Sequence, residues 1–317
     1  MDYFFAVFLL LFALYGVPRQ AFKRPKGISL IFIIAYSVVY FMLLVPRVAI
    51  PPLNPVGLIL GLCLWISSMK FLFDKPVSFD FIVKIFLMIA PPILLAYYIP
   101  ARNGFHVVDG FILIFVVHYV AARYWTLPII TDKNLLFEFD VIYKTLLLTL
   151  LIIFRSFREI DVGFNFSFNF QNLTITIVTA LGLMITCTIM AIQLQFLKLQ
   201  TPKIKLPEIS TIFVLMFLFV ALPEEFIFRG LLYNYLSQYI ACWGNIIPWL
   251  LSSLTFGIAH FRGGWKMIAL AAMAGCFYCF VYWKTGNIFY AALIHTLTNV
   301  FRKYGLTAVQ VQKGADF

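Results

Sequence analysis

The sequence is poor in charged residues. Only 12% of its 317 residues are Asp, Glu, Lys or Arg, whereas 63% are hydrophobic. This composition supplies too little polar surface to coat a soluble globule of this size. Apolar runs of roughly twenty residues recur along the chain, and each has the length of one membrane-spanning helix. We therefore expect an all-α, polytopic integral membrane protein with about ten or eleven transmembrane helices.

Short segments with charges, proline or glycine separate these apolar runs. The basic loops 18–27 and 198–208 are expected on the cytoplasmic side, which places the N-terminus outside. The first residues lack the basic start and the small-residue cleavage site of a signal peptide, so we count them as a span. The expected spans lie near residues 3–17, 28–45, 56–73, 81–99, 107–122, 139–154, 174–197, 209–235, 245–261, 265–283 and 287–302.

Acidic residues are scarcer than basic ones, 13 against 24, which gives a net charge of +11. The Lys and Arg residues are dispersed among short loops and form no basic stripe, which argues against a nucleic-acid partner. An excess of Lys and Arg in loops is typical of membrane topology. The partner that the composition predicts is the lipid bilayer.

Cysteine is also scarce. The five cysteines are an odd number and lie mostly inside apolar runs, so no disulfide framework is indicated. Cys276 and Cys279 have a spacing found in redox and metal sites, but on a helix they are simply three residues apart in an apolar run. Packing is the role that we expect for them.

Two polar stretches, 122–140 and 155–173, are the longest of the chain. Within the second, Phe164–Phe170 alternates aromatic with polar residues, which predicts an extended segment with one apolar face. Such a segment either lies at the lipid interface, where aromatic rings are favoured, or forms an edge that helps to hold an extended peptide.

Ionisable residues inside membrane spans cost a few kcal/mol each, so they mark functional candidates. Some have a simpler explanation. Lys70 and Lys84 lie near span ends and can reach the interface, while Asp109 and His118 bracket one span with no obvious partner motif.

Three polar clusters interrupt the last third of the chain, each on a different expected helix: Pro223–Gly230, Phe256–His260 and His295–Asn299. On the first helix, Glu225 and Arg229 are i, i+4 neighbours that can form an ion pair. Glu224 lies about 100° round the helix and points elsewhere. One carboxylate is thus neutralised locally, and the other is left free.

A free carboxylate in a low-dielectric cavity has its pKa raised toward neutrality, where it can take a proton from water and return it to a leaving amine. Glu224 is therefore the candidate general base of a hydrolase, and His260 could share in activating the water. His295 and Asn299 share one helix face and could supply donors to an oxyanion. Core packing alone explains poorly why two of only four histidines fall in these clusters.

In this order on successive hydrophobic helices, the clusters resemble the three motifs of the CAAX protease and bacteriocin-processing family: Glu224-Glu225-x-x-x-Arg229, Phe256-x-x-x-His260 and His295-x-x-x-Asn299. That family includes the type II CAAX prenyl endopeptidases. The resemblance covers roughly residues 205–305. It implies an all-helical intramembrane endopeptidase whose conical cavity opens to one aqueous side and whose substrate is a membrane-associated protein or peptide.

The resemblance also implies roles for the motif residues. Glu224 would activate the water with His260. His295 and Asn299 would stabilise the oxyanion. Structural support of the site would come from Glu225 and Arg229.

The family was long described as metalloproteases. This sequence has no His-Glu-x-x-His helix and no third strong ligand beside the two histidines. We therefore favour a glutamate mechanism without a cofactor. Zinc held by Glu224, His260 and His295 is the alternative.

The resemblance divides the chain into three parts. Residues 1–200 form an N-terminal transmembrane extension of unknown role, 201–305 the catalytic core and 306–317 a polar C-terminal tail. Nothing in the sequence indicates recognition of a prenyl group. We expect the bacterial cytoplasmic membrane, or the endoplasmic reticulum membrane if the source is eukaryotic.

Two other functions stay open. The first is a non-catalytic member of the same fold that acts as an immunity or scaffold protein. The second is a transporter, although the polar clusters lie only in the last third and no repeat of two related halves is visible.

Overall fold

The computed structural model describes residues 35–40, 43, 54–74, 76–101, 104–122, 126–132, 137–165, 169–199, 206–240 and 246–308. The expected span 3–17 lies outside these residues, and the expected span 28–45 is described only in part.

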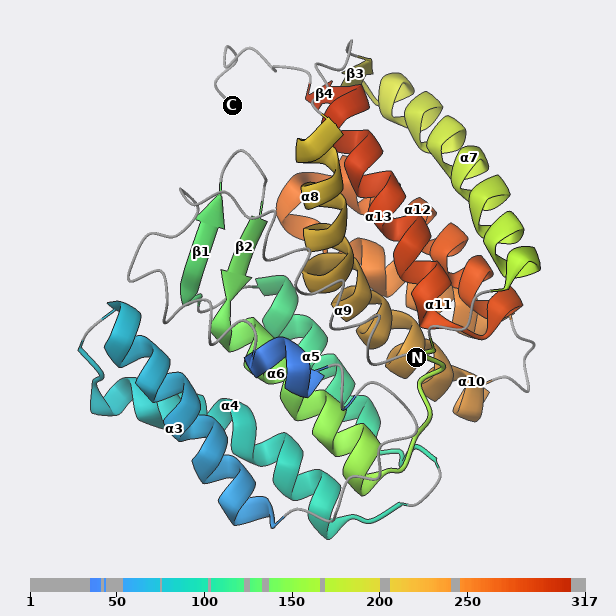
Figure 1. The fold of residues 1–317 in the computed structure, drawn as a ribbon. Coiled ribbons are helices and arrows are strands. Elements are labelled where there is room, and N and C mark those ends of the chain that lie inside the picture. Colours follow the sequence, from blue (N-terminus) through green and yellow to red (C-terminus); the bar gives the residue numbers. More distant parts are fainter. Residues whose placement is uncertain are drawn as a thin grey trace, which may run out of the picture.

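The described part of the N-terminal extension includes the helices α3 (Pro55–Asp74), α4 (Phe79–Tyr98), α5 (Asp109–Ala122) and α6 (Val141–Ile152). Helices α3 and α4 pack side by side (Figure 1). Helix α6 continues as a short π-helix, η2 (Ile153–Phe157), and is buried over almost its whole length. Because α6 is mostly apolar, burial inside the bundle is the stable place for it.

One long helix begins the C-terminal part and changes its winding four times. Its segments are α8 (Leu206–Met216), η3 (Phe217–Ala221), α9 (Leu222–Glu225), η4 (Phe226–Tyr233) and α10 (Asn234–Ile240). Two π-helical segments, η3 and η4, thus enclose the short α9 turn. Such π segments inside α-helices occur frequently at functional sites.

Further helices of the described residues pack on this long helix or on one another. They are α7 (Phe170–Gln193), α11 (Ile246–Ile258), the 3₁₀ turn η6 (Phe261–Gly263), α12 (Gly264–Thr285) and α13 (Ile288–Gly305). Helix α7 packs along α12 and α13, and α11 packs on α12 (Figure 1).

Five of the described helical stretches are long and apolar enough to cross a membrane: Pro55–Phe73, Phe79–Tyr98, Phe170–Gln193, Glu208–Ile240 and Phe261–Thr285. The protein is thus a helical integral membrane protein, but the expected ten or eleven spans are not confirmed. The apolar window of Glu208–Ile240 is 72% buried, against 22–39% in the other four. The long helix is therefore central, whereas the others expose apolar faces suited to lipid.

Two short antiparallel sheets are additions that the sequence analysis did not foresee. Strand β1 (Pro128–Asp132) pairs with β2 (Phe137–Asp140), within a stretch expected to be an irregular polar segment. Strand β3 (Leu197–Leu199) pairs with β4 (Leu306–Ala308), so the expected C-terminal tail begins as a strand. In each sheet the two strands pair their backbone N–H and C=O groups with each other, whereas a loop would leave these groups to solvent.

The aromatic-polar segment Phe164–Phe170 is not a strand at its described ends. Phe164 is fully buried, and Asn165 accepts hydrogen bonds from the side-chain amide of Asn287. Asn169 caps the start of α7. Residues 166–168 lie outside the described residues, so both interpretations of this segment stay open.

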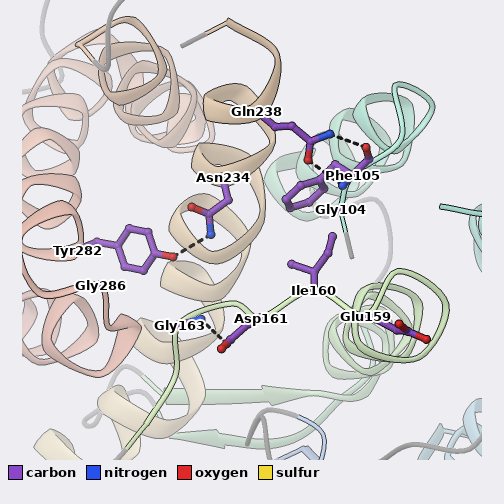
Figure 2. A pocket seen from close by; sticks show the side chains of 10 residues that line it. All are labelled: Gly104, Phe105, Glu159, Ile160, Asp161, Gly163, Asn234, Gln238, Tyr282 and Gly286. Atoms are coloured by element: carbon purple, nitrogen blue, oxygen red, sulfur yellow. Dashed lines mark hydrogen bonds between the residues drawn. The ribbon is translucent and has the colours of Figure 1, made fainter. Parts of the chain in front are cut away.

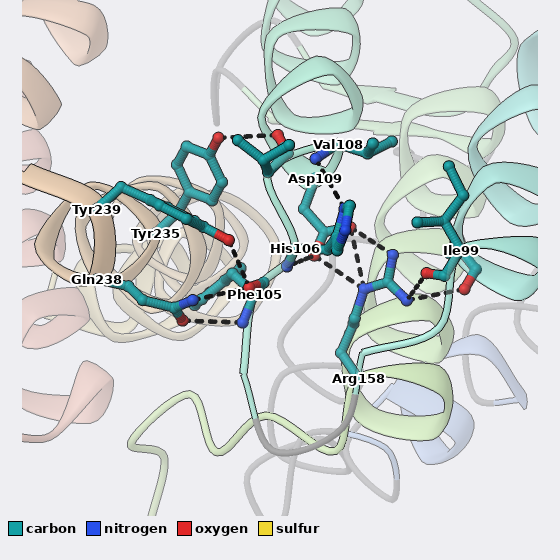
Figure 3. A network of polar contacts seen from close by, with 11 residues as sticks. Ile99, Phe105, His106, Val108, Asp109, Arg158, Tyr235, Gln238 and Tyr239 are labelled. Carbon is teal, nitrogen blue, oxygen red and sulfur yellow. Dashed lines mark hydrogen bonds and ion pairs between the residues drawn. The ribbon is translucent and has the colours of Figure 1, made fainter.

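Asp109 has a partner that the sequence analysis did not find. The fully buried Arg158 forms an ion pair with it at 2.7 Å and also donates to the carbonyls of Ala96 and Ile99, each at 2.8 Å (Figure 3). A buried charge needs such compensation, so this network joins α4, α5 and η2 into one unit.

The same region joins the extension to the long helix. Gln238 donates to the carbonyl of Phe105 at 2.7 Å and accepts from its amide at 2.9 Å, and the Tyr239 hydroxyl donates to the same carbonyl (Figure 3). The Tyr235 hydroxyl donates to the carbonyl of Val107. Helix α10 therefore holds the loop that precedes α5.

Candidate active site

Glu225 and Arg229 pair as their i, i+4 spacing predicts. The distance from Arg229 Nη1 to Glu225 Oε1 is 3.1 Å, and neither side chain is exposed. Arg229 Nη2 donates to the carbonyl of Gly275 at 2.8 Å, and the guanidinium also lies over the rings of Phe256 and Tyr278. The pair is thus embedded between three helices.

Gly275 makes this contact possible. A Cβ atom at its position would lie 3.1 Å from the carbonyl oxygen of Ser253 and 3.2 Å from Arg229 Nη2. Both distances are shorter than ordinary van der Waals contact. The missing side chain therefore lets α12 approach α11 and the arginine closely.

His295 connects the two glutamates. Its Nδ1 lies 2.8 Å from Glu225 Oε1 and its Nε2 lies 3.7 Å from Glu224 Oε2, while its ring stacks on Tyr278 with centroids 4.5 Å apart. An ionised carboxylate only accepts hydrogen bonds, so Nδ1 carries the proton of that bond. The Nε2 atom is thus the one that His295 presents to Glu224.

Glu224 differs from Glu225 in its surroundings. Its side chain is 23% exposed, and its Oε2 has no hydrogen-bond partner among the described residues. The 3.7 Å to His295 Nε2 is too long for a hydrogen bond. Glu224 therefore keeps an oxygen that can accept a hydrogen bond from a reacting group next to the His295 ring.

His260 and Asn299 lie near this cluster without direct bonds to it. His260 lies two residues after the end of α11, and its Nδ1 lies 2.8 Å from the carbonyl of Phe256, which fixes the ring. The Phe256 ring contacts both histidines, with centroids 4.8 Å from His260 and 5.6 Å from His295. Asn299 follows one turn after His295 on α13, is partly exposed, and has no hydrogen bond to other described residues.

The residues therefore group in two ways. Glu224, Glu225, Arg229 and His295 form one connected cluster. His260 faces the same aromatic ring as His295, and Asn299 shares a helix with His295. The sequence grouped Glu224 with His260, whereas the histidine beside Glu224 is His295.

A cleft of about 530 Å³ lies elsewhere, between α10, the loop that follows η2 and the turn between α12 and α13 (Figure 2). Polar residues line it, among them Glu159, Asp161, Asn234 and Gln238. Asn234 is ten residues along the helix from Glu224, or about 15 Å. This cleft is therefore separate from the motif residues.

A zinc-dependent mechanism, the alternative to the glutamate mechanism, needs several side chains that converge on one metal ion. No group of three His, Cys, Asp or Glu side chains in the described ranges has a geometry that could hold a metal. His295 Nδ1 is engaged by Glu225, and His260 Nδ1 by a backbone carbonyl. Both contacts use Nδ1, and a zinc-binding histidine normally uses one ring nitrogen for such a contact and the other for the metal, so zinc stays the alternative to a metal-free mechanism.

The sequence analysis missed Lys144. It lies on α6, outside the motif region, is only 2% exposed, and donates to the carbonyl of Phe219 on the long helix. A lysine inside the apolar run Val141–Ile152 was the signal that could have marked it, because an intramembrane charge needs a partner.

The fold is that of a helical membrane protein, and in its cluster Glu224, Glu225 and Arg229 on the central helix meet His295 from α13. Residues 206–301 match the family described as "Type II CAAX prenyl endopeptidase Rce1-like". All six motif residues lie within the matched range, which confirms the resemblance. The activity that this family implies is proteolysis. No curated protein and no solved structure matches the chain.

Proposed function

We propose that the protein is an intramembrane endopeptidase that hydrolyses a peptide bond of a membrane-associated protein by means of water activated by Glu224. The observation that carries the proposal is the connected chain from Glu224 through His295 and Glu225 to Arg229, inside the matched domain. Glu225 and Arg229 neutralise each other. Glu224 is then the carboxylate available for proton transfer.

The chemistry follows from the atoms that remain available. Glu224 takes a proton from water as the water oxygen attacks the carbonyl carbon of the substrate, and His260 helps to orient that water. The oxyanion accepts hydrogen bonds from the side-chain amide of Asn299 and from Nε2–H of protonated His295. Glu224 then gives its proton to the leaving amine nitrogen as the C–N bond breaks.

Glu225 and Arg229 act by holding His295. The bond from His295 Nδ1 to Glu225 orients the ring, and Arg229 fixes Glu225 from the other side. Stacking on Tyr278 restricts the ring further. A reacting group held in this way needs little reorganisation during the reaction.

The proposed mechanism uses no metal, since the sequence has no His-Glu-x-x-His helix of the kind that zinc proteases use. The substrate is a protein or peptide associated with the bilayer. We place the enzyme in the bacterial cytoplasmic membrane, or in the endoplasmic reticulum membrane of a eukaryotic host.

The deciding experiment compares fragments of membrane proteins in cells that carry the wild-type chain, Glu224→Gln or Glu208→Gln. Glu208 is the matched control because it lies on the same long helix and its carboxylate accepts from Tyr304, far from the motifs. We expect substrate fragments with the wild type and Glu208→Gln, and none with Glu224→Gln. Identical fragment patterns in all three would favour a non-catalytic immunity or scaffold role.

A further inference from the structure

Helix α12 carries a tryptophan and a lysine near each of its ends. Trp265 and Lys266 lie in its first turn, where the ammonium is 5.9 Å from the ring centroid of the tryptophan. Trp283 and Lys284 lie in its last turn, where the same distance is 4.1 Å. Both tryptophans are more than half exposed. They lie about 27 Å apart along the helix, close to the hydrocarbon thickness of a bilayer, so each end of α12 lies at one membrane interface.

The first end of α12 continues an exposed apolar face of α11. Leu250, Leu254 and Ile258 lie one turn apart on α11 and are each at least half exposed. Phe261, in the turn η6 that joins α11 to α12, is also exposed. Together with Trp265 these side chains form one apolar stripe with aromatic residues at its end. This pattern is typical of a helix that leaves the hydrocarbon region for the headgroup region.

Three cations lie at this end of α12. Arg262 and Arg302 are exposed, and Lys266 is partly exposed. Arg302 reaches from α13 to the sulfur of Met267 at 4.0 Å, and a thioether is only a weak acceptor. Among the described residues, none of the three cations forms an ion pair with a carboxylate, and the first turn of α12 has no acidic residue. Their positive charge is therefore available to a ligand.

The two ends of α12 differ in the carboxylates near them. Gly286, the residue after α12, lines the polar cleft together with Glu159 and Asp161. At the first end, Glu208 on α8 accepts a hydrogen bond from the Tyr304 hydroxyl of α13. Both ends thus have the tryptophan and the lysine of an interfacial helix, but only the first adds two arginines to them. An anionic ligand is expected at the first end.

We propose that Phe261, Arg262, Trp265, Lys266 and Arg302 form a binding surface for the headgroups of anionic phospholipids, which we call the α12 basic surface. Arginine binds phosphate oxygens through its planar guanidinium, and lysine binds them as a point charge. The two exposed aromatic rings lie at the level of the headgroups. The surface thus matches a lipid that has an anionic headgroup and apolar chains.

The α12 basic surface adjoins a candidate active-site residue. His260 immediately precedes Phe261, and its carbonyl accepts from the amide of Gly263 within the same turn. Because η6 is short, lipid headgroups bound to this surface fix the depth of His260 in the bilayer. The proposal goes beyond the proposed function, since headgroup binding requires no cleavage.

Three variants test the role of charge. The triple variant Arg262→Gln/Lys266→Gln/Arg302→Gln removes the three positive charges, and Arg262→Lys/Arg302→Lys keeps them. Lys284→Gln is the matched control, because it removes one charge beside the tryptophan at the other end of the same helix. Each full-length protein is reconstituted into phosphatidylcholine vesicles.

The measurement is the quenching of Trp265 fluorescence by lipids with brominated acyl chains. Brominated phosphatidylglycerol or brominated phosphatidylcholine replaces the vesicle lipid at increasing mole fraction. Each protein is compared with the same protein that also carries Trp265→Phe, so the difference reports Trp265 alone. The result is the mole fraction of each brominated lipid that gives half of the maximal quenching.

We expect the wild type to reach this point at a mole fraction of phosphatidylglycerol at least about fivefold lower than that of phosphatidylcholine, because each cation near an anionic headgroup contributes a factor of about five. Lys284→Gln and Arg262→Lys/Arg302→Lys should keep this preference, and the triple variant should lose it. Equal mole fractions in the wild type, or an undiminished preference in the triple variant, would overturn the proposal.

The wild type in concentrated salt provides a test that does not depend on the folding of a variant. In about 1 M salt the Debye length falls to about 3 Å, so the preference for phosphatidylglycerol should largely disappear. A preference that persists unchanged would contradict an electrostatic surface. If the wild type cleaves no better than Glu224→Gln, the proposed function fails, whereas the quenching result still decides whether the α12 basic surface binds anionic lipid.

Discussion

Replacing Arg229 with alanine should destabilise the protein far more than changing Glu224, although both residues lie in the same motif. Arg229 is completely buried and bonds to Glu225 and to the Gly275 carbonyl. Its removal leaves the Glu225 charge buried, with His295 as its one remaining side-chain partner among the described residues. Breaking one side of a buried pair in this way costs about 3–5 kcal/mol.

Glu224→Gln makes a much smaller change. The side chain is 23% exposed, the substitution preserves its shape, and no hydrogen bond of Glu224 Oε2 is lost. Substitutions of this kind usually change the free energy of unfolding by less than about 1 kcal/mol. The two variants should thus differ by several kcal/mol.

The assay is thermal unfolding of both variants in the same detergent, together with the yield of monodisperse protein. For a chain of this size the difference corresponds to a midpoint lower by on the order of 10 °C for Arg229→Ala. The double variant Glu225→Gln/Arg229→Met provides a control, because replacing both charges should restore much of the lost stability. Equal midpoints and equal yields of Arg229→Ala and Glu224→Gln would refute the buried ion pair.

Three further outcomes follow. Cleavage should survive exhaustive chelation with phenanthroline, and the purified protein should carry less than one zinc ion per chain. The metal-free mechanism would be contradicted by stoichiometric zinc whose removal abolishes cleavage and whose return restores it. Asp109→Asn should leave Arg158 buried without its counter-charge and lower the free energy of unfolding by about 3–5 kcal/mol. The loops around α5 should then be cut faster by a protease, and an unchanged rate of proteolysis would contradict that network. Gly275→Val should lower the free energy of unfolding by about 1–3 kcal/mol, because the added side chain forces α12 away from Ser253. Gly61→Val is the control, because nothing lies within 4 Å of a Cβ atom at that position. Equal melting temperatures of the two variants would contradict the close packing at Gly275.

The sequence alone determined the solvent and the resemblance to a protease family. A hydrophobic content of 63% leaves lipid as the only environment for most helix faces. The i, i+4 spacing of Glu225 and Arg229 is a local property of one helix, so it predicted their pair before any tertiary contact was known. The same holds for the order of the three motifs, which identified the domain later matched at residues 206–301.

Tertiary structure decided which groups meet across helices. His295 lies 70 residues from Glu225 in the sequence, and this separation does not predict that His295 rather than His260 lies beside the two glutamates. Arg158 and Asp109 meet across 49 residues, and Lys144 reaches Phe219 across 75. These contacts depend on how whole helices pack. Local spacing encodes contacts within one helix, whereas contacts between helices are set by the packing of the complete bundle.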